Sequence, residues 1–114
     1  MDISNTLNKF LTPVENYSQL IGAGLAGLNF KNGLIESANA ILSGNIHAPN
    51  IENVLNYVKD AQDIKTFATL AIGGYIAQGA TNNSTVNRLG KIAQKVGTGY
   101  LTVAAIAIAL YFST

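Results

Sequence analysis

The sequence predicts an all-α protein, namely an antiparallel four-helix bundle with short connections that forms one structural domain over residues 1–114. Apolar residues recur at steps of three and four, which is the period of a helix that buries one face. Polar turns separate these periodic segments. Alanine and isoleucine alternate at residues 104–109 as in a strand, but the helical period continues on both sides of them. The length suits one domain with one core.

Charged residues are scarce in this chain. They make up 11% of it, against 48% for hydrophobic residues, whereas a typical soluble domain has about 25% charged residues. A small soluble monomer normally covers much of its surface with charge, so the chain should either lie in lipid or bury much of its surface against other protein. The net charge of +1 gives no overall field that attracts nucleic acid. The absence of cysteine excludes disulfides and thiolate chemistry.

The first part of the chain is expected to hold two helices. Residues 3–11 have a short amphipathic spacing, and Pro13 should end or kink this helix. A second helix is expected over residues 13–42, because residues 12–15 (Thr-Pro-Val-Glu) form a helix start with a capping threonine and a glutamate three residues later. Glycines in this segment leave open whether residues 22–33 form one helix or a broken one.

The third predicted helix follows a turn at residues 43–50, which holds a glycine and a proline. Asn50 can cap this helix, which is expected to continue to Ala80. Its first half is amphipathic. Residues 66–80 carry no charge and have apolar residues on every side, so this half is expected to be buried all round.

The fourth helix is expected over residues 84–112, with Ser84 as its cap. No charge occurs in residues 97–112. The apolar positions of this helix form a heptad-like seam. They are Val86, Leu89, Ala93, Val96, Tyr100, Val103, Ala107 and Leu110.

The run IGAGLAGLNF at residues 21–30 contains glycines in the spacing G-x-G-x-x-G. In a dinucleotide-binding protein this spacing follows a buried strand and starts a helix, but here the residues ahead of Gly22 already belong to a predicted helix. Pairs of small residues four apart let another helix backbone approach closely. The sequence therefore predicts helix packing at this run, with a loop between two shorter helices as the alternative. The residues predicted to pack helices closely, within a copy or between copies, are Gly22, Ala23, Ala26, Gly27, Gly73, Gly74, Ala77, Tyr100, Ala104 and Ala107.

The best candidates for ligand binding are Arg88, Lys91 and Lys95. They lie on one side of the fourth predicted helix, roughly opposite its apolar seam. Three cations on one face could contact phosphates if many copies lined a lumen around DNA. The alternative is that this face is solvated.

The sequence predicts no catalytic, metal-binding or cofactor-binding residues, and therefore a protein that is not an enzyme and has no small-molecule substrate. The single histidine, His47, stands in a turn, which excludes a histidine-based metal set and a Ser-His-Asp arrangement. Asp60 and Asp63 are expected on one helical face, where pairing with Lys59 is favoured over cation binding. Tyrosines at helical spacing are expected in the core or at interfaces.

Residues 66–80 and 97–112 are the candidates for membrane helices. A helix of 16 residues, the length of the second segment, spans about 24 Å, which is less than the ~30 Å hydrocarbon core. Such lengths are typical of core or interface helices, and a strained hairpin in lipid is the alternative. The first residues lack the basic and apolar regions of a signal peptide, so unprocessed protein made in the cytoplasm is expected.

The small size and lack of cysteine occur together with helix starts at TPVE and Asn50 and with three uncharged segments, LIGAGLAGLNF, TFATLAIGGYIAQGA and YLTVAAIAIALYF. In these features the whole chain resembles the hydrophobic, all-helical major coat proteins of archaeal viruses, particularly tailed spindle-shaped viruses. The resemblance implies a structural subunit that assembles with copies of itself into a helical virion wall enclosing DNA. The expected partners are other copies, with packaged DNA or lipid inside the wall. Rod-shaped relatives tend to be more basic, so the net charge of +1 argues against intimate DNA wrapping.

Two other classes share features with the chain. The hairpin of two apolar helices around NRLGKIAQK is similar to conjugative and DNA-import pilins, which would place the chain in a membrane or a cell-surface filament. A small membrane protein of the holin type is the third reading, although the chain ends in ALYFST rather than in a charged tail.

Overall fold

The computed structural model describes residues 3–114 and places most of them in helices. The helices are α1 (Ile3–Asn29), α2 (Lys31–Leu42), α3 (Ile51–Asp60), α4 (Gln62–Ala80) and α5 (Ser84–Ser113). No strand occurs among these described residues. The predicted all-α class is therefore confirmed.

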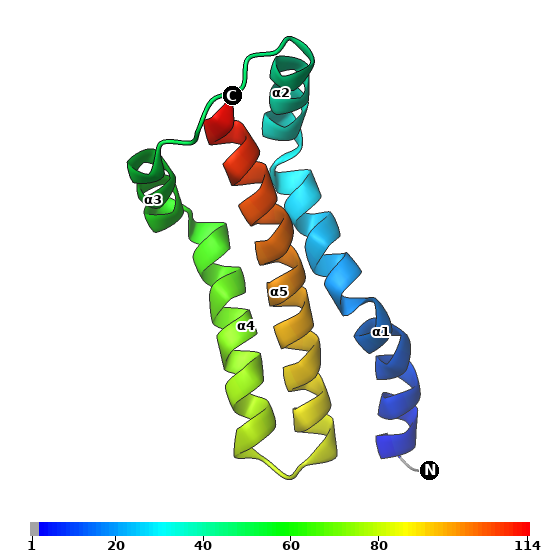
Figure 1. The fold of residues 1–114 in the computed structure, drawn as a ribbon. Coiled ribbons are helices and arrows are strands. Elements are labelled where there is room, and N and C mark those ends of the chain that lie inside the picture. Colours follow the sequence, from blue (N-terminus) through cyan, green and yellow to red (C-terminus); the bar gives the residue numbers. More distant parts are fainter. Residues whose placement is uncertain (1–2) are drawn as a thin grey trace.

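The long helices form a flat layer, with α5 in the middle and α1 and α4 along its two sides (Figure 1). A tight turn at residues 81–83 joins α4 to α5, and these two helices run antiparallel. In contrast, α1 runs parallel to α5, because Glu15 pairs with Arg88 and, farther along both helices, Gly22 lies against Val96. The molecule measures 60 × 24 × 17 Å. The two short helices, α2 and α3, lie near the C-terminal end of α5 (Figure 1).

The predicted antiparallel four-helix bundle does not match this arrangement. The described chain has five helices, and the layer contains one parallel pair and one antiparallel pair. The period of apolar residues identifies the buried face of a helix, but it does not determine the direction of the neighbouring helix. The number of predicted connections between helices was also too small, because two of the predicted helices are each interrupted once.

Pro13 lies inside α1, so of the two outcomes predicted there, an end or a kink of the first helix, the end does not occur, and the predicted helix start at residues 12–15 is wrong. Proline removes one backbone hydrogen bond and usually kinks a helix rather than abolishing it when other contacts hold the segment. Here Arg88 of α5 binds the side chains of Thr12 and Glu15, on either side of the proline. These contacts join the proline-containing turn to α5.

The two breaks occur at Phe30 and Ala61. At Phe30 (φ −104°, ψ 12°) the chain changes direction between α1 and α2, within residues 22–33, whose continuity the sequence left open. At Ala61 the backbone is extended (φ −77°, ψ 105°), so the predicted single helix after Asn50 is wrong and becomes α3 and α4. Neither glycine nor proline marks Ala61. The break lets α3 turn toward the end of α5, where Tyr57 packs edge-on against Phe112.

Asparagine side chains start α3 and α5. Oδ1 of Asn50 accepts a hydrogen bond from the backbone N–H of Asn53 at 3.3 Å, as expected for the predicted cap. Oδ1 of Asn83 accepts from the backbone N–H groups of Thr85 and Val86. The cap of α5 is therefore Asn83, and the prediction of Ser84 was one residue too late.

Glycines bring the backbones of α1 and α5 into contact. A Cβ atom at Gly22 would overlap the carbonyl oxygen of Val96 and lie 2.9 Å from the backbone nitrogen of Tyr100. A Cβ atom at Gly99 would likewise overlap the carbonyl oxygen of Gln19. Only glycine fits at these two positions without moving the helices apart.

Glycines also bring the backbones of α4 and α5 into contact. A Cβ atom at Gly97 would lie 2.5 Å from the carbonyl oxygen of Phe67 and 2.7 Å from the backbone nitrogen of Ala71. Gly74 and Gly90 face each other closely enough that a Cβ on Gly74 would overlap the carbonyl oxygen of Gly90. The helix α5 therefore touches backbone on both of its sides.

The second half of the predicted third helix is not buried all round. Ala71 and Gly74 are buried against α5, whereas Ile72, Tyr75 and Ile76 are exposed. The prediction of complete burial is therefore wrong for the single copy. The reason is that α4 lies at an edge of the layer and has only one helical neighbour along its length.

Replacing Gly22 with alanine should destabilise the fold by about 1–3 kcal/mol, the usual cost of an atom added to a filled interface. Gly27→Ala is the matched control, because a Cβ there meets no atom within 4 Å. This control should be neutral or more stable by up to about 1 kcal/mol, since alanine favours helix over glycine. Urea unfolding of dilute protein, followed by circular dichroism, measures both. Equal stability of the two variants would contradict the close approach of α1 and α5.

Candidate functional site

Large apolar side chains lie on the outer edges of the layer. Leu20 is two positions from Gly22, and Ile72 and Ile76 are two positions on either side of Gly74. Two positions turn a helix by about 200°, so these side chains point away from α5 and are 67%, 62% and 60% exposed, respectively. Other exposed large apolar residues of α1, α4 and α5 are Phe10, Tyr17, Ile21, Leu25, Leu28, Leu70, Tyr75, Val86, Leu89, Ile106 and Tyr111. A single copy therefore leaves much of its apolar surface uncovered.

Nine of the ten residues predicted to pack helices closely fall into two groups, and Ala23 belongs to neither. The first group lies at the helix contacts or in the core of one copy and comprises Gly22, Ala26, Gly74, Ala77, Tyr100, Ala104 and Ala107. The second group, Gly27 and Gly73, has open space where a Cβ would stand, and Ala23 is half-buried. Gly24, which the sequence reading did not select, also has open space beside it. At these three glycines the fold of one copy does not require the absence of a side chain.

The three predicted phosphate-binding residues have different surroundings. Arg88 Nε donates to Glu15 Oε2 at 2.5 Å, and Arg88 Nη2 donates to Thr12 Oγ1 at 2.9 Å. The hydrogen bond from Arg88 lowers the pKa of Glu15 below its usual value, partial burial opposes this shift, and the charges of Arg88, Lys95 and Lys91 add to the lowering. Lys91 is exposed and Lys95 is half-buried. Arg88 thus joins α5 to α1, and the two lysines remain the candidates for phosphate contact.

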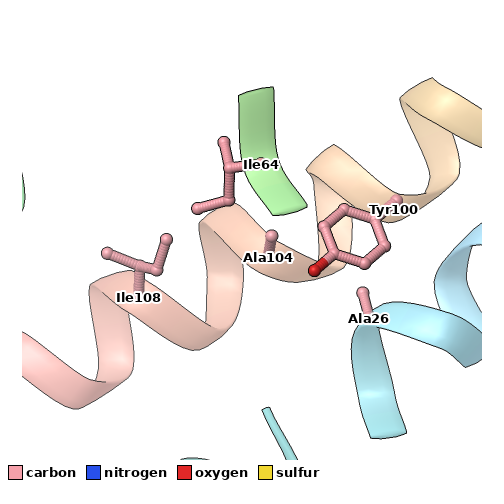
Figure 2. Packing of buried hydrophobic residues seen from close by; sticks show 5 residues of the cluster. All are labelled: Ala26, Ile64, Tyr100, Ala104 and Ile108. Carbon is pink, nitrogen blue, oxygen red and sulfur yellow. The ribbon is translucent and has the colours of Figure 1, made fainter. Parts of the chain in front are cut away.

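The core of the layer centres on Tyr100. This residue is 0% exposed and lies with Ala104 and Ile108 on α5 between Ala26 of α1 and Ile64 of α4 (Figure 2). Two of these five side chains, Ala26 and Ala104, are small, which agrees with the closeness of the helices. Among the described residues, Tyr100 is the largest side chain that is fully buried.

Tyr100 also holds the polar contacts of the core. Its ring stacks on that of Phe67, with centroids 3.8 Å apart and planes 7° apart. Its hydroxyl accepts a hydrogen bond from Asn29 Nδ2 at 2.8 Å, and the same amide group lies 3.5 Å from Asp63 Oδ2. Burial raises the pKa of Tyr100, the hydrogen bond from Asn29 opposes this shift, and the charge of Asp63 adds to it. The cluster links all three helices of the layer through one phenol.

A cavity of about 250 Å³ opens next to this cluster. It is lined by Asn29, Phe30, Gly33, Tyr57, Ala107, Ile108, Tyr111 and Phe112. These walls supply an amide, phenols and apolar groups, so they offer no carboxylate, imidazole or thiol for acid–base or nucleophilic chemistry.

The remaining candidate polar residues do not converge. In the described part of the chain, no group of three or more His, Cys, Asp or Glu residues could hold a metal ion. The break at Ala61 puts Asp60 and Asp63 on different helices, so the predicted shared face is wrong. His47 is exposed, and its ring Nδ1 is 3.0 Å from the carbonyl oxygen of Ala48.

One helix in the described residues, α5, is long and apolar enough to cross a membrane, judged by length and composition. Core helices of soluble proteins meet the same criterion. The other candidate segment, on α4, does not meet it.

Comparison with known proteins found no protein-family model, no curated protein and no solved structure that matches the chain.

Sequence reasoning missed the ion pair between Glu15 and Arg88 and the hydrogen bond between Asn29 and Tyr100. A signal for the ion pair was present. Glu15 is the only acidic residue between positions 3 and 35, and Arg88 is the only arginine of the chain. An isolated charge on an apolar helix usually needs a partner. Asn29 carried no comparable signal, because asparagine is frequent along the whole chain.

Acidification should remove the contribution of the ion pair. The pKa of Glu15 is lowered in the fold, so its contribution is fully present above the usual glutamate value of 4.5 and is lost as the pH falls through the lowered pKa. The wild-type chain should therefore lose about 1 kcal/mol more stability than Glu15→Gln between neutral pH and a pH of about 3. Urea unfolding at each pH measures this difference, and Arg88→Gln should flatten the profile in the same way. Parallel profiles for all three proteins would exclude a stabilising pair.

Alkaline titration should distinguish Tyr100 from the other tyrosines. Because its pKa is raised above the usual value of 10.0, the contribution of neutral Tyr100 is present below that value and is lost as the pH rises through the raised pKa. Phenolate absorbance of the folded chain should show a late-ionising component, and Tyr100→Phe should remove it. The same variant should cost about 0.5–1.5 kcal/mol, because the amide of Asn29 loses its partner. A late component that persists in Tyr100→Phe would assign it to another tyrosine.

Proposed function

We propose that the chain is a non-enzymatic structural subunit that assembles with copies of itself into a helical wall, and that this wall is the coat of a virion enclosing DNA. The observation that carries the proposal is the uncovered surface of the single copy. The chain exposes 7471 Å². A folded monomer of 12.0 kDa is expected to expose about 6,000 Å².

Assembly is the physical outcome that this surface favours. The excess of about 1,500 Å² over a compact monomer is accompanied by exposed leucine, isoleucine and tyrosine side chains along all three layer helices. Apolar area removed from water contributes about 25 cal/mol per Å². If half of the excess is apolar, covering it contributes about 20 kcal/mol, which exceeds the association cost of about 4–15 kcal/mol.

The proposal that the wall encloses DNA depends on the two lysines that remain candidates for phosphate contact. Lys91 and Lys95 lie on the same helix and are repeated in every copy of a lattice, so many weak phosphate contacts would add up along DNA. This reading agrees with the resemblance to hydrophobic coat proteins of archaeal viruses.

A filament subunit of the pilin type is the alternative that a specific observation favours. The antiparallel α4–α5 hairpin contains the one helix of the described residues that could cross a membrane. A pilin would be stored in the membrane and then assembled into a cell-surface filament. The same helix would also fit a holin-like membrane protein, which forms no ordered assembly.

Electron microscopy of protein purified without detergent tests the proposal. Regular tubes or shells that protect DNA from nuclease are expected. Ordered filaments without protected DNA would favour the pilin. Protein that stays insoluble until detergent is added, with no ordered assembly, would contradict both assembly readings and favour the membrane protein.

Replacing Gly27 with leucine should block assembly while leaving the fold of one copy unchanged. A Cβ atom at Gly27 would meet no atom within 4 Å in the single copy, so we expect a leucine there to fit unless another copy lies beside it. Circular dichroism should show an unchanged helical fold, and electron microscopy should show no ordered particles. Normal assembly of Gly27→Leu would remove Gly27 from the contact surface. Ala105→Leu, on the exposed side of α5, adds the same side chain elsewhere and serves as the control that should assemble.

A further inference from the structure

The two edges of the layer present apolar surfaces of different shape. The outer face of α1 carries Leu20, Gly24 and Leu28 in one row at steps of four. Both leucines are exposed, and no atom stands within 4 Å of a Cβ at Gly24, so this row has a gap at its centre. The outer face of α4 carries Ile72 and Ile76, exposed β-branched side chains one turn apart. One edge therefore has a notch and the other has a ridge.

The uncovered area indicates how many contacts each copy needs. A standard protein interface covers about 800 Å² on each partner. The excess of about 1,500 Å² corresponds to about two such surfaces. Two apolar edges are present, one on α1 and one on α4, so each copy has two surfaces of the required kind.

Lipid is a poorer cover for these edges than protein. Gly74, in the middle of the uncharged stretch of α4, packs against Gly90 and the backbone of Gln94. The next residues on α5 are Lys91 and Lys95, respectively, so both lysines stand at the same depth as the centre of that stretch. A bilayer that covered α4 would also bury them, at about 2.5–3.5 kcal/mol for each lysine. A protein partner can cover the edge of α4 and leave the lysines in water.

We propose that copies of the chain join edge to edge, with the outer face of α1 in one copy packed against the outer face of α4 in the next. Large side chains of one helix pack best into gaps between side chains of another, and Ile72 or Ile76 fits the gap at Gly24. Because the two faces differ, the contact is heterologous and each copy can bind one neighbour at each edge. Repetition of the contact extends the layer without closing it into a pair.

This inference rests on the proposed assembly and specifies the surfaces that meet. It places α4 of one copy beside α1 of the next and thereby continues the order α4, α5, α1 across copies. It also gives the open glycine Gly24 a role that the single copy does not provide.

Cysteine cross-linking tests the contact, because the chain has no cysteine of its own. A disulfide forms only when two Cα atoms approach to about 4.4–6.8 Å, so it reports direct contact between helices. The variants are Gly24→Cys, Ile72→Cys and the double variant with both changes. The matched control is Gly24→Cys combined with Ala105→Cys, since Ala105 is exposed on α5, away from the edges. Each assembled protein is oxidised mildly and run on a non-reducing gel.

The expected result is a ladder of covalent multimers for the Gly24→Cys/Ile72→Cys chain, with monomers for each single variant and for the control pair. Equal mixtures of the two single variants should give dimers that contain one of each. Efficient dimers from either single variant alone would show a symmetric contact and overturn the heterologous one. Ordered particles of the double variant with no disulfide would place the contact elsewhere and overturn the inference while leaving the proposed assembly intact. Absence of particles from the unmodified chain would instead contradict the proposed function.

A charge on the ridge gives a second test that does not need disulfides. Ile72→Asp points into solvent in the single copy, so its helical circular dichroism should match that of the unmodified chain. Light scattering should show that Ile72→Asp remains monomeric at concentrations where Thr102→Asp, a control on the exposed side of α5, still assembles. Assembly of both variants would exclude the α4 edge from the contact.

Discussion

The direct approach of helix backbones on both sides of α5 determines the rest of this structure. Gly90 and Gly97 let α4 come close, and Gly22 and Gly99 do the same for α1. Contacts of this kind gain van der Waals energy from backbone atoms, so they need small residues where an ordinary soluble bundle uses leucine and isoleucine. The helix contacts are consequently made largely by glycine and alanine, and the large side chains buried beside them are Tyr100, Ile64 and Ile108.

The closeness of the helices also explains the apolar surface. In a bundle, large apolar side chains fill the space between helices, but a layer only 17 Å thick has little such space. Leu20, Ile72 and Ile76 therefore point outward. The same distribution, with small residues inside and large apolar residues outside, occurs where the surroundings of a helix group are themselves apolar. The packing of small residues between the helices, with large apolar residues outside, thus accounts for both the scarcity of charge in the sequence and the shape of the fold.

Part of the fold and part of the site could be predicted from the sequence. The predictable features depend on residues close together in the chain, and the others depend on contacts between distant segments. The helical class, the cap at Asn50 and the polar turn before α5 follow from local chemistry, so residues near one another in the chain are sufficient to predict them. The break at Ala61 depends on the apolar surface that α3 contacts at the end of α5, and no residue near Ala61 in the sequence indicates it. For the glycines, composition shows that close contact is needed, but the fold decides that Gly22 meets α5 within the copy while Gly24 faces outward.

The charge of the chain limits what a wall built from it could do to DNA. Arg88 is bound to Glu15, and the net charge of each copy is +1, whereas duplex DNA carries one negative charge per about 1.7 Å of its axis. Copies that lined a lumen would neutralise only a small share of that charge, so most counterions would stay with the DNA. Binding that depends on few released counterions changes little with salt. A coat of this chain would therefore enclose DNA mainly through the closure of its wall, and its stability would depend on apolar contacts between copies rather than on attraction to the packaged molecule.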